Sequence, residues 1–174
     1  SVADAANTSV YIQISKENYT TWTSGSQNAT ISPKGISDSD IQIAPYSGTY
    51  DGNPHAAISS VKGCPDGCTI KYSIDGKNWK DDCPTVESVA DAANTSVYIQ
   101  ISKENYTTWT SGSQNATISP KGISDSDIQI APYSGTYDGN PHAAISSVKG
   151  CPDGCTIKYS IDGKNWKDDC PTVE

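Results

Sequence analysis

The stretch TSVYIQIS, at residues 8–15 and again at residues 95–102, decides the fold. Apolar and polar residues alternate in it, so that Val10, Ile12 and Ile14 share one face of an extended chain. This period of two predicts a half-buried β-strand. The composition agrees, since the chain lacks Leu, Phe, Met and Arg but is rich in Ile, Val, Thr and Tyr, which suit pleated sheets. We therefore expect an all-β fold.

The recurrence of this stretch is part of a repeat that covers the whole chain. Residues 88–174 reproduce residues 1–87 without a single substitution. The identity extends to Lys, Ser and Thr residues of the kind that usually face solvent. Such a pair is a recent or homogenised duplication, a slice through a longer array, or an engineered tandem. Natural duplication of this kind points to a structural repeat whose role depends on copy number.

Other strand signals follow within each unit of 87 residues. In residues 27–32, Ala29 and Ile31 share one face. In residues 69–74, Ile70, Tyr72 and Ile74 share one face. The predicted strands besides residues 8–15 are Gln27–Ser32, Ile41–Pro45, Ala56–Val61 and Thr69–Ile74. A hairpin turn, DGKN at residues 75–78, precedes a returning strand that Trp79 opens.

The order of these turns and strands resembles a known family. The unit contains YDG at 50–52, GCPDG at 63–67, TIKYSIDGKNW at 69–79 and PT at 84–85, followed by TSVYIQIS and ATIS. This order is similar to the MBG-type bacterial immunoglobulin-like repeats, which are small β-sandwich modules strung along large cell-surface proteins. The family often has an Asp-x-Gly-Thr-Tyr-like approach to its penultimate strand. This chain has DAANT at 91–95 instead.

The resemblance implies a module frame that is permuted relative to the chain ends. A complete tandem immunoglobulin-like β-sandwich module would span residues 36–122, with residues 1–35 as the C-terminal half of one module and 123–174 as the N-terminal half of another. A half sandwich leaves an apolar face and unpaired strand edges in water. Three interpretations follow: the chain is a slice of an array; residues 123–174 pair with residues 1–35 of the next molecule in a head-to-tail polymer; or the frame is displaced.

Charge and the residues available for chemistry narrow the function classes. The formal net charge is −8 and the sequence pI about 4.6, which argues against binding to nucleic acid or anionic membranes. No apolar run is long enough for membrane insertion. Each unit has one His, no Arg and no glycine-rich phosphate loop. We therefore expect no enzyme, no catalytic or metal site and no cofactor.

Three cysteines in each unit are the candidates for a disulfide or crosslink. The predicted turns place all three thiols at one pole of the module. One disulfide can form, either between Cys83 and one of Cys64 and Cys68 or between the latter two, and one thiol remains for a crosslink between chains or as a buried free thiol. Metal or redox use is a third alternative. The six candidates are Cys64, Cys68, Cys83, Cys151, Cys155 and Cys170.

The unit also carries three N-x-[ST] sequons. They predict a glycoprotein, whereas the alternative is that abundant Ser and Thr create sequons by chance. The glycosylation candidates are Asn7, Asn18, Asn28, Asn94, Asn105 and Asn115.

Together these features predict a structural repeat of an extracellular fibre or cell-surface stalk whose partner is its own sequence. The alternative is an adhesin module that binds a glycan or a host protein through exposed aromatic side chains. Trp22 with Tyr19 on a polar loop, and Trp79 after the hairpin turn, are the candidates for stacking on a sugar.

Overall fold

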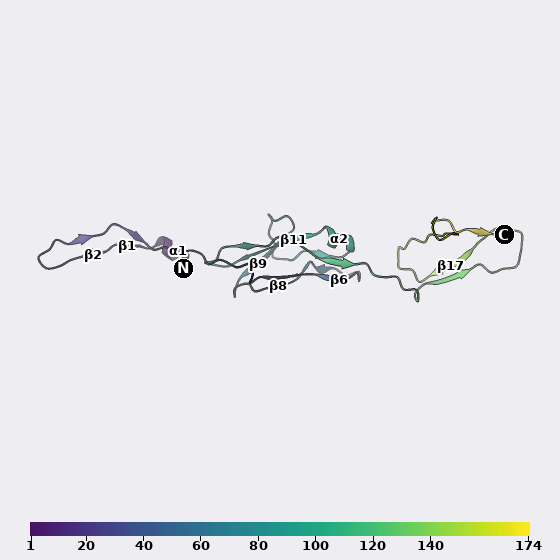
Figure 1. Ribbon diagram of the computed structural model, residues 1–174, viewed down its shortest axis with the longest axis horizontal. Coiled ribbons are helices and arrows are strands. Elements are labelled where there is room, and N and C mark those ends of the chain that lie inside the picture. Colours follow the sequence, from purple (N-terminus) through teal and green to yellow (C-terminus); the bar gives the residue numbers. More distant parts are fainter. The chain divides into compact units, whose positions relative to one another are not determined.

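A computed structural model describes all residues from Ser1 to Glu174. The chain is built mostly of short strands, and its only helices are two segments of six residues. It divides into two compact units, Ser1–Pro120 and Lys121–Glu174. Figure 1 traces the elements along the chain. The prediction of a mainly β protein is confirmed at this level.

The first unit contains what we call the N-terminal half-module, residues 1–35, and the central module, residues 36–122. The elements of the N-terminal half-module are α1 (Val2–Asn7), β1 (Ser9–Val10), β2 (Gln13–Ile14), β3 (Trp22–Thr23) and β4 (Gln27–Asn28). Those of the central module are β5 (Gln42–Pro45), β6 (Ser47–Thr49), β7 (His55–Ala56), β8 (Ile58–Lys62), β9 (Thr69–Ser73), β10 (Thr85–Val86), α2 (Val89–Asn94), β11 (Ser96–Ser102), β12 (Trp109–Thr110), β13 (Gln114–Asn115) and β14 (Thr117–Ser119).

The second unit contains the C-terminal half-module, residues 123–174. Its strands are β15 (Gln129–Pro132), β16 (His142–Ala143), β17 (Ile145–Lys149) and β18 (Thr172–Val173). They form two separate pairs, β15 with β17 and β16 with β18, all antiparallel.

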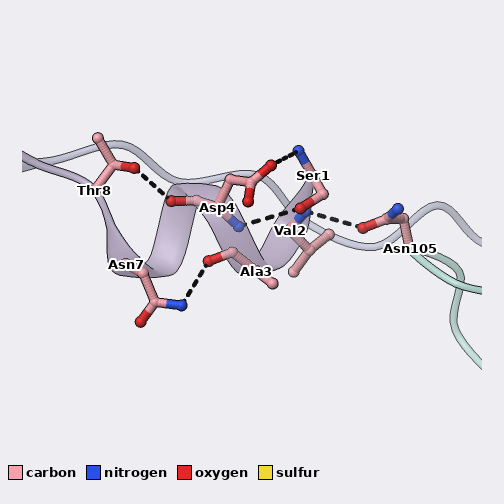
Figure 2. Close-up of polar contacts among 7 residues, drawn as sticks. All are labelled: Ser1, Val2, Ala3, Asp4, Asn7, Thr8 and Asn105. Carbon is pink, nitrogen blue, oxygen red and sulfur yellow. Dashed lines mark hydrogen bonds and ion pairs between the residues drawn. The ribbon is translucent and has the colours of Figure 1, made fainter.

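Both helices have the sequence VADAAN, and the sequence analysis missed them because one and a half turns are too short to show a helical period. Local capping explains why they form. The amide of Asp4 donates to Oγ of Ser1 at 3.2 Å, and the carboxylate of Asp4 accepts from the terminal amine at 3.1 Å. Figure 2 shows these contacts, together with a bond from the amide of Val2 to Oδ1 of Asn105 at 3.0 Å.

The hydrophobic core lies almost entirely in the central module. Nine of the ten buried hydrophobic residues of the chain form one cluster there, and the tenth is Ala5. Strand β11 supplies the largest share, because Val97, Ile99 and Ile101 are all fully buried. The cluster consists of Ala57, Ile58, Val86, Ala92, Val97, Ile99, Ile101, Ala116 and Ile118.

Strand β11 is also the centre of the largest sheet. It pairs with β9 along one edge, and with β12 and β13 along successive parts of the other. The remaining strands of the central module form the pairs β5–β8, β7–β10 and β6–β14, of which only the last is parallel. Figure 1 shows β11 and β9 on one side of this module and β8 and β6 on the other.

The predicted faces hold for two strands and fail for a third. Burial alternates strictly along β11, and Ala116 and Ile118 are both buried, as the patterns predict for the second copy. In the first copy, residues 8–15 and 27–32 form only strands of two residues with exposed side chains, so the prediction of half-buried strands is wrong there. The prediction for Ile74 is wrong: it is 65% exposed, because β9 ends at Ser73, which turns inward and bonds the hairpin residue Asp75. The returning strand is reduced to a single bridge between Tyr72 and Lys80.

Candidate functional site: two open half-modules

The central module is held together across two seams between residues 36–87 and 88–122. In the first, five residues of β9 pair antiparallel with β11, from Tyr98 opposite Ser73 to Ser102 opposite Thr69. In the second, three residues of β14 run parallel to β6, with Ile118 opposite Gly48. These seams, together with the core, are what the two halves of a module offer each other.

The N-terminal half-module has the sequence of residues 88–122, but no front half is paired with it. Its internal pairing is nevertheless the same, because Ser9 pairs with Asn28 and Ile14 with Trp22, 87 residues before the pairs of β11 with β13 and β12. What differs is its outer edge. The counterpart of β11 is broken into β1 and β2, and no strand pairs with it where β9 lies in the central module.

The apolar face of this half-module is exposed. Val10, Ile12 and Ile14 are 51%, 50% and 60% exposed, whereas their counterparts in β11 are fully buried. Ile31 is 52% exposed, whereas its counterpart Ile118 is 5% exposed. Since the sequences are identical, the difference follows from what lies beside each copy: β9 pairs with β11, and no corresponding strand pairs with β1 and β2.

In the C-terminal half-module, the counterparts of β9 and β6 are the segments without a pairing strand. This half-module keeps the β5–β8 and β7–β10 pairings of the central module, and even the register shift in β5 recurs at Pro132. Residues 156–160, which correspond to β9, form no strand, and neither do residues 134–136, which correspond to β6. Both elements therefore become strands only in the module where a back half covers them.

Exposed large hydrophobic side chains are concentrated in the two half-modules. Of the 17 in the chain, only Tyr50, Ile74 and Val89 lie in the central module. Seven lie in residues 1–35 and seven in residues 123–174. Scattered exposed apolar residues are ordinary, but such concentrations of them are typical of interaction surfaces.

A hollow of about 190 Å³ marks one part of this surface in the C-terminal half-module. It is lined by Gly135 and Thr136, the counterparts of β6 residues, and by Tyr133, Asp138 and His142. The ring of Tyr133 stacks on His142 with centroids 4.3 Å apart and lies over the position that a Cβ on Gly135 would need. The hollow thus follows the edge that β14 occupies in the central module.

The three thiols of the repeat do not all lie at one pole of the module, contrary to the prediction from the sequence. Cys64 and Cys68 form a disulfide across the PDG turn with a Cα–Cα distance of 6.3 Å, and Cys151 and Cys155 do the same. Cys83 is free and half-buried against the core. Its thiol donates to the carbonyl of Pro84 at 3.5 Å and lies near the backbone amides of Ala57 and Ile58, at the start of β8, whereas Cys64 follows the end of that strand.

The pKa of the Cys83 thiol is raised, because burial disfavours the thiolate more than the two amides favour it. A raised pKa reduces the reactivity of a thiol. Cys170 is also free and half-buried. These positions fit the reading of a buried free thiol better than that of an exposed crosslink.

All six sequon asparagines are exposed, but their amides are engaged to different degrees. Nδ2 of Asn7 donates to a carbonyl within its helix, and so does Nδ2 of Asn94. Asn115 donates to Thr95 and Ser96 across β11 and β13. Asn18 and Asn105 occupy the left-handed region, with φ of 67° and 63°. In Asn28 the carbonyl oxygen accepts from Ser9.

The aromatic side chains proposed for sugar stacking become partly covered where a module is complete. Trp22 is 56% exposed, but its counterpart Trp109 packs on the core and donates from Nε1 to Asp38 at 2.5 Å. Trp79 is half-buried, while its counterpart Trp166 is 60% exposed. Both tryptophans of the 87-residue repeat are therefore less exposed in the central module than in the half-modules.

Two carboxylates of the central module have perturbed acidity. The side chain of His55, 3.0 Å away, and the amide of Asn53 lower the pKa of Asp51 to about 2. The amides of Asn78 and Lys77 hold the pKa of Asp75 far below its usual range. Both carboxylates are exposed and stabilise turns. No group of three or more His, Cys, Asp or Glu side chains is placed to hold a metal ion.

Comparisons with known proteins identify no relative. No family model matches the chain, no curated protein matches its sequence, and no solved structure matches it. In addition, no helix of the chain has the length and apolar character needed to cross a membrane. The two exposed and complementary half-modules are therefore the feature from which a function has to be argued.

Proposed function

We propose that this chain is a structural repeat of an extracellular fibre or cell-surface stalk, built of immunoglobulin-like sandwich modules, and that molecules of these 174 residues join head to tail by strand complementation. The single observation that carries the proposal is the burial of the same sequence in two settings. Residues 88–122 bury Val97, Ile99 and Ile101 against a front half, while residues 1–35 leave the same three side chains exposed.

The energy available for such a joint is substantial. Four aliphatic residues, Val10, Ile12, Ile14 and Ile31, would pass from about half exposed to buried. At half of the ~1.5–3 kcal/mol for complete burial of such a side chain, they contribute about 3–6 kcal/mol together. Eight further residue pairs across the two seams would satisfy backbone groups at open strand edges. In a longer array the adjoining repeat of the same polypeptide would supply this completion.

An extracellular setting is supported by the paired cysteines. Disulfides persist in oxidising compartments, and each unit of this chain pairs Cys64 with Cys68 or their counterparts. The exposed sequons would allow a glycan coat where the host attaches one. The charge of −8 would keep a repetitive β protein soluble.

The test is electron microscopy and light scattering of the purified chain over a range of concentrations. Head-to-tail joining predicts filaments with an axial repeat of roughly 35–45 Å per module, from a longest strand of seven residues at ~3.3 Å each plus the loops at both ends. A mass that stays at 18.4 kDa at every concentration would contradict the proposal.

The alternative function, an adhesin module, rests on the exposed aromatic side chains. Trp166 and Tyr137 are 60% and 83% exposed in the C-terminal half-module. A glycan array probed with the same chain separates the two functions: specific binding that survives at concentrations where the chain is monomeric would favour the adhesin.

A further inference from the structure

We infer that the partner of residues 1–32 is residues 123–174 of a second copy, in one register that places Ile12 opposite Tyr159, Ile14 opposite Ile157 and Ile31 opposite Gly135. This inference rests on the proposed head-to-tail assembly and adds the identity of the facing residues. It follows from moving the two seams of the central module by one repeat.

Both pieces already hold the shape that they have in a complete module. The N-terminal half-module keeps its two internal strand pairings, and the C-terminal half-module keeps both of its own. Only the two seams are missing. Docking therefore requires residues 11–15 and 156–160 to become a strand pair, and residues 30–32 to enter the hollow beside Gly135. Such preorganisation lowers the conformational cost of association.

The alternation of side chains fixes the register. A slip by one residue would turn Ile12 and Ile14 to solvent and Tyr11 and Gln13 into the core. A slip by two residues would keep the same side chains facing the core. It would, however, shift residues 11–15 along residues 156–160 while residues 30–32 stayed opposite residues 134–136. Because Ile31 has to meet Gly135 at the same time, the two seams constrain each other.

The chain cannot satisfy its N-terminal half-module with its own residues 36–87. Ser119 pairs with Thr49 where the chain leaves the central module. Ile36, where the chain enters, lines a second hollow together with Gly63, whose neighbour Lys62 pairs with Gln42. The seven steps from Gln42 to Thr49 span about 23 Å in extended chain. If Ser32 took the place of Ser119, four residue steps to Ile36 would have to cover that length, but they reach only about 14 Å.

Charge does not oppose the joint, although each chain is strongly acidic. Residues 1–35 contain Lys16 and Lys34 against Asp4 and Glu17, so their side chains sum to zero. The C-terminal half-module has eight acidic side chains and four lysines, a sum of −4. The pieces that meet are therefore a neutral and a negative one. In the central module Lys103 donates to the carbonyl of Asp66, which predicts the same bond from Lys16 to Asp153 at the joint.

Disulfide trapping tests the register. In a background with Cys83 and Cys170 changed to Ser, one variant carries Gln13→Cys and another carries Lys158→Cys; their counterparts Gln100 and Lys71 face each other across β9 and β11. Mixed under mild oxidation, the two variants should give a linked dimer that contains the peptides around residues 13 and 158. Replacing Lys158→Cys by Ser160→Cys, two residues out of register, should reduce the yield at least tenfold.

Two controls make the outcomes distinct. A chain with Gln100→Cys and Lys71→Cys should close an internal disulfide in the central module, which verifies that this pair of positions can be bridged. Light scattering of the unlinked variants reports assembly separately. Oligomers that link through Ser160→Cys, or not at all, would overturn the register and leave head-to-tail assembly standing. A third chain that carries both Gln13→Cys and Lys158→Cys should form linked multimers; if it links only within one molecule, the second copy is overturned as the partner. Absence of oligomers would overturn both proposals.

Discussion

Replacing Ile12 by Ala should weaken the joint while leaving the central module intact. Ile12 is half exposed in the free half-module, and its counterpart Ile99 is fully buried. Transfer of the remaining half of the side chain accounts for about 1–1.5 kcal/mol. A cavity in the completed core adds to this, since truncation of a buried Ile to Ala costs about 2–5 kcal/mol. Allowing for the half already buried, we expect a loss of about 2–3 kcal/mol.

This loss corresponds to an association constant about 30- to 150-fold lower. Sedimentation velocity over a concentration series measures it directly. Because the repeat supplies a matched position, Ile99→Ala is the control. It should lower the thermal unfolding midpoint of the central module, whereas Ile12→Ala should not change it. The reasoning would be refuted by an unchanged association constant for Ile12→Ala, or by equal loss of module stability in the two variants.

Further predictions concern the central module. Gly63→Ala should destabilise it by at least about 1–3 kcal/mol, measured by urea unfolding, because Gly63 has a φ of 82° and a Cβ would overlap the carbonyl of Asp40. Cys83→Ser should leave oligomer mass unchanged with or without reductant; dissociation on loss of this thiol would instead assign it to the joint. Asp51→Asn should make the free energy of unfolding depend less on pH between about pH 4 and 2, as measured by Trp fluorescence. The reason is that a carboxyl whose pKa is lowered in the folded state stabilises that state above its ordinary pKa of 3.8, and this contribution is lost as the pH falls towards 2.

How far the sequence predicts this structure depends on the range of the interaction. The alternation at residues 95–102 predicts β11 and its buried face, because a period of two is a local property of the chain. Helix α2 escapes the same reasoning, since a capped segment of six residues has too few positions to show a period. Strand β6 escapes it for another reason: SGT has no strand pattern and becomes a strand only where β14 lies beside it.

The candidate site shows the same division. The repeat and the permuted frame predict two half-modules with exposed apolar faces from counting alone. The choice among disulfide pairings needs three-dimensional positions, because it depends on where Cys83 lies after an irregular segment. The predicted shared pole of the thiols was wrong because residues 81–84 do not continue as a strand beside β9 but lead to Ala57, whose amide donates to Pro84 at 2.8 Å.

The opposite placement of the two ends of the central module has a mechanical consequence. Within that module, tension passes along an unbroken backbone, but at a joint it would pass from one molecule to the next through hydrogen bonds and side chains alone. Since the chain enters near Gly63 and leaves near Thr49, a pull on the proposed fibre would run along the strands of the joint. The seam bonds are then sheared together and do not open one after another. Rupture should therefore need many bonds to break at once, and each break should leave two folded half-modules that can rejoin.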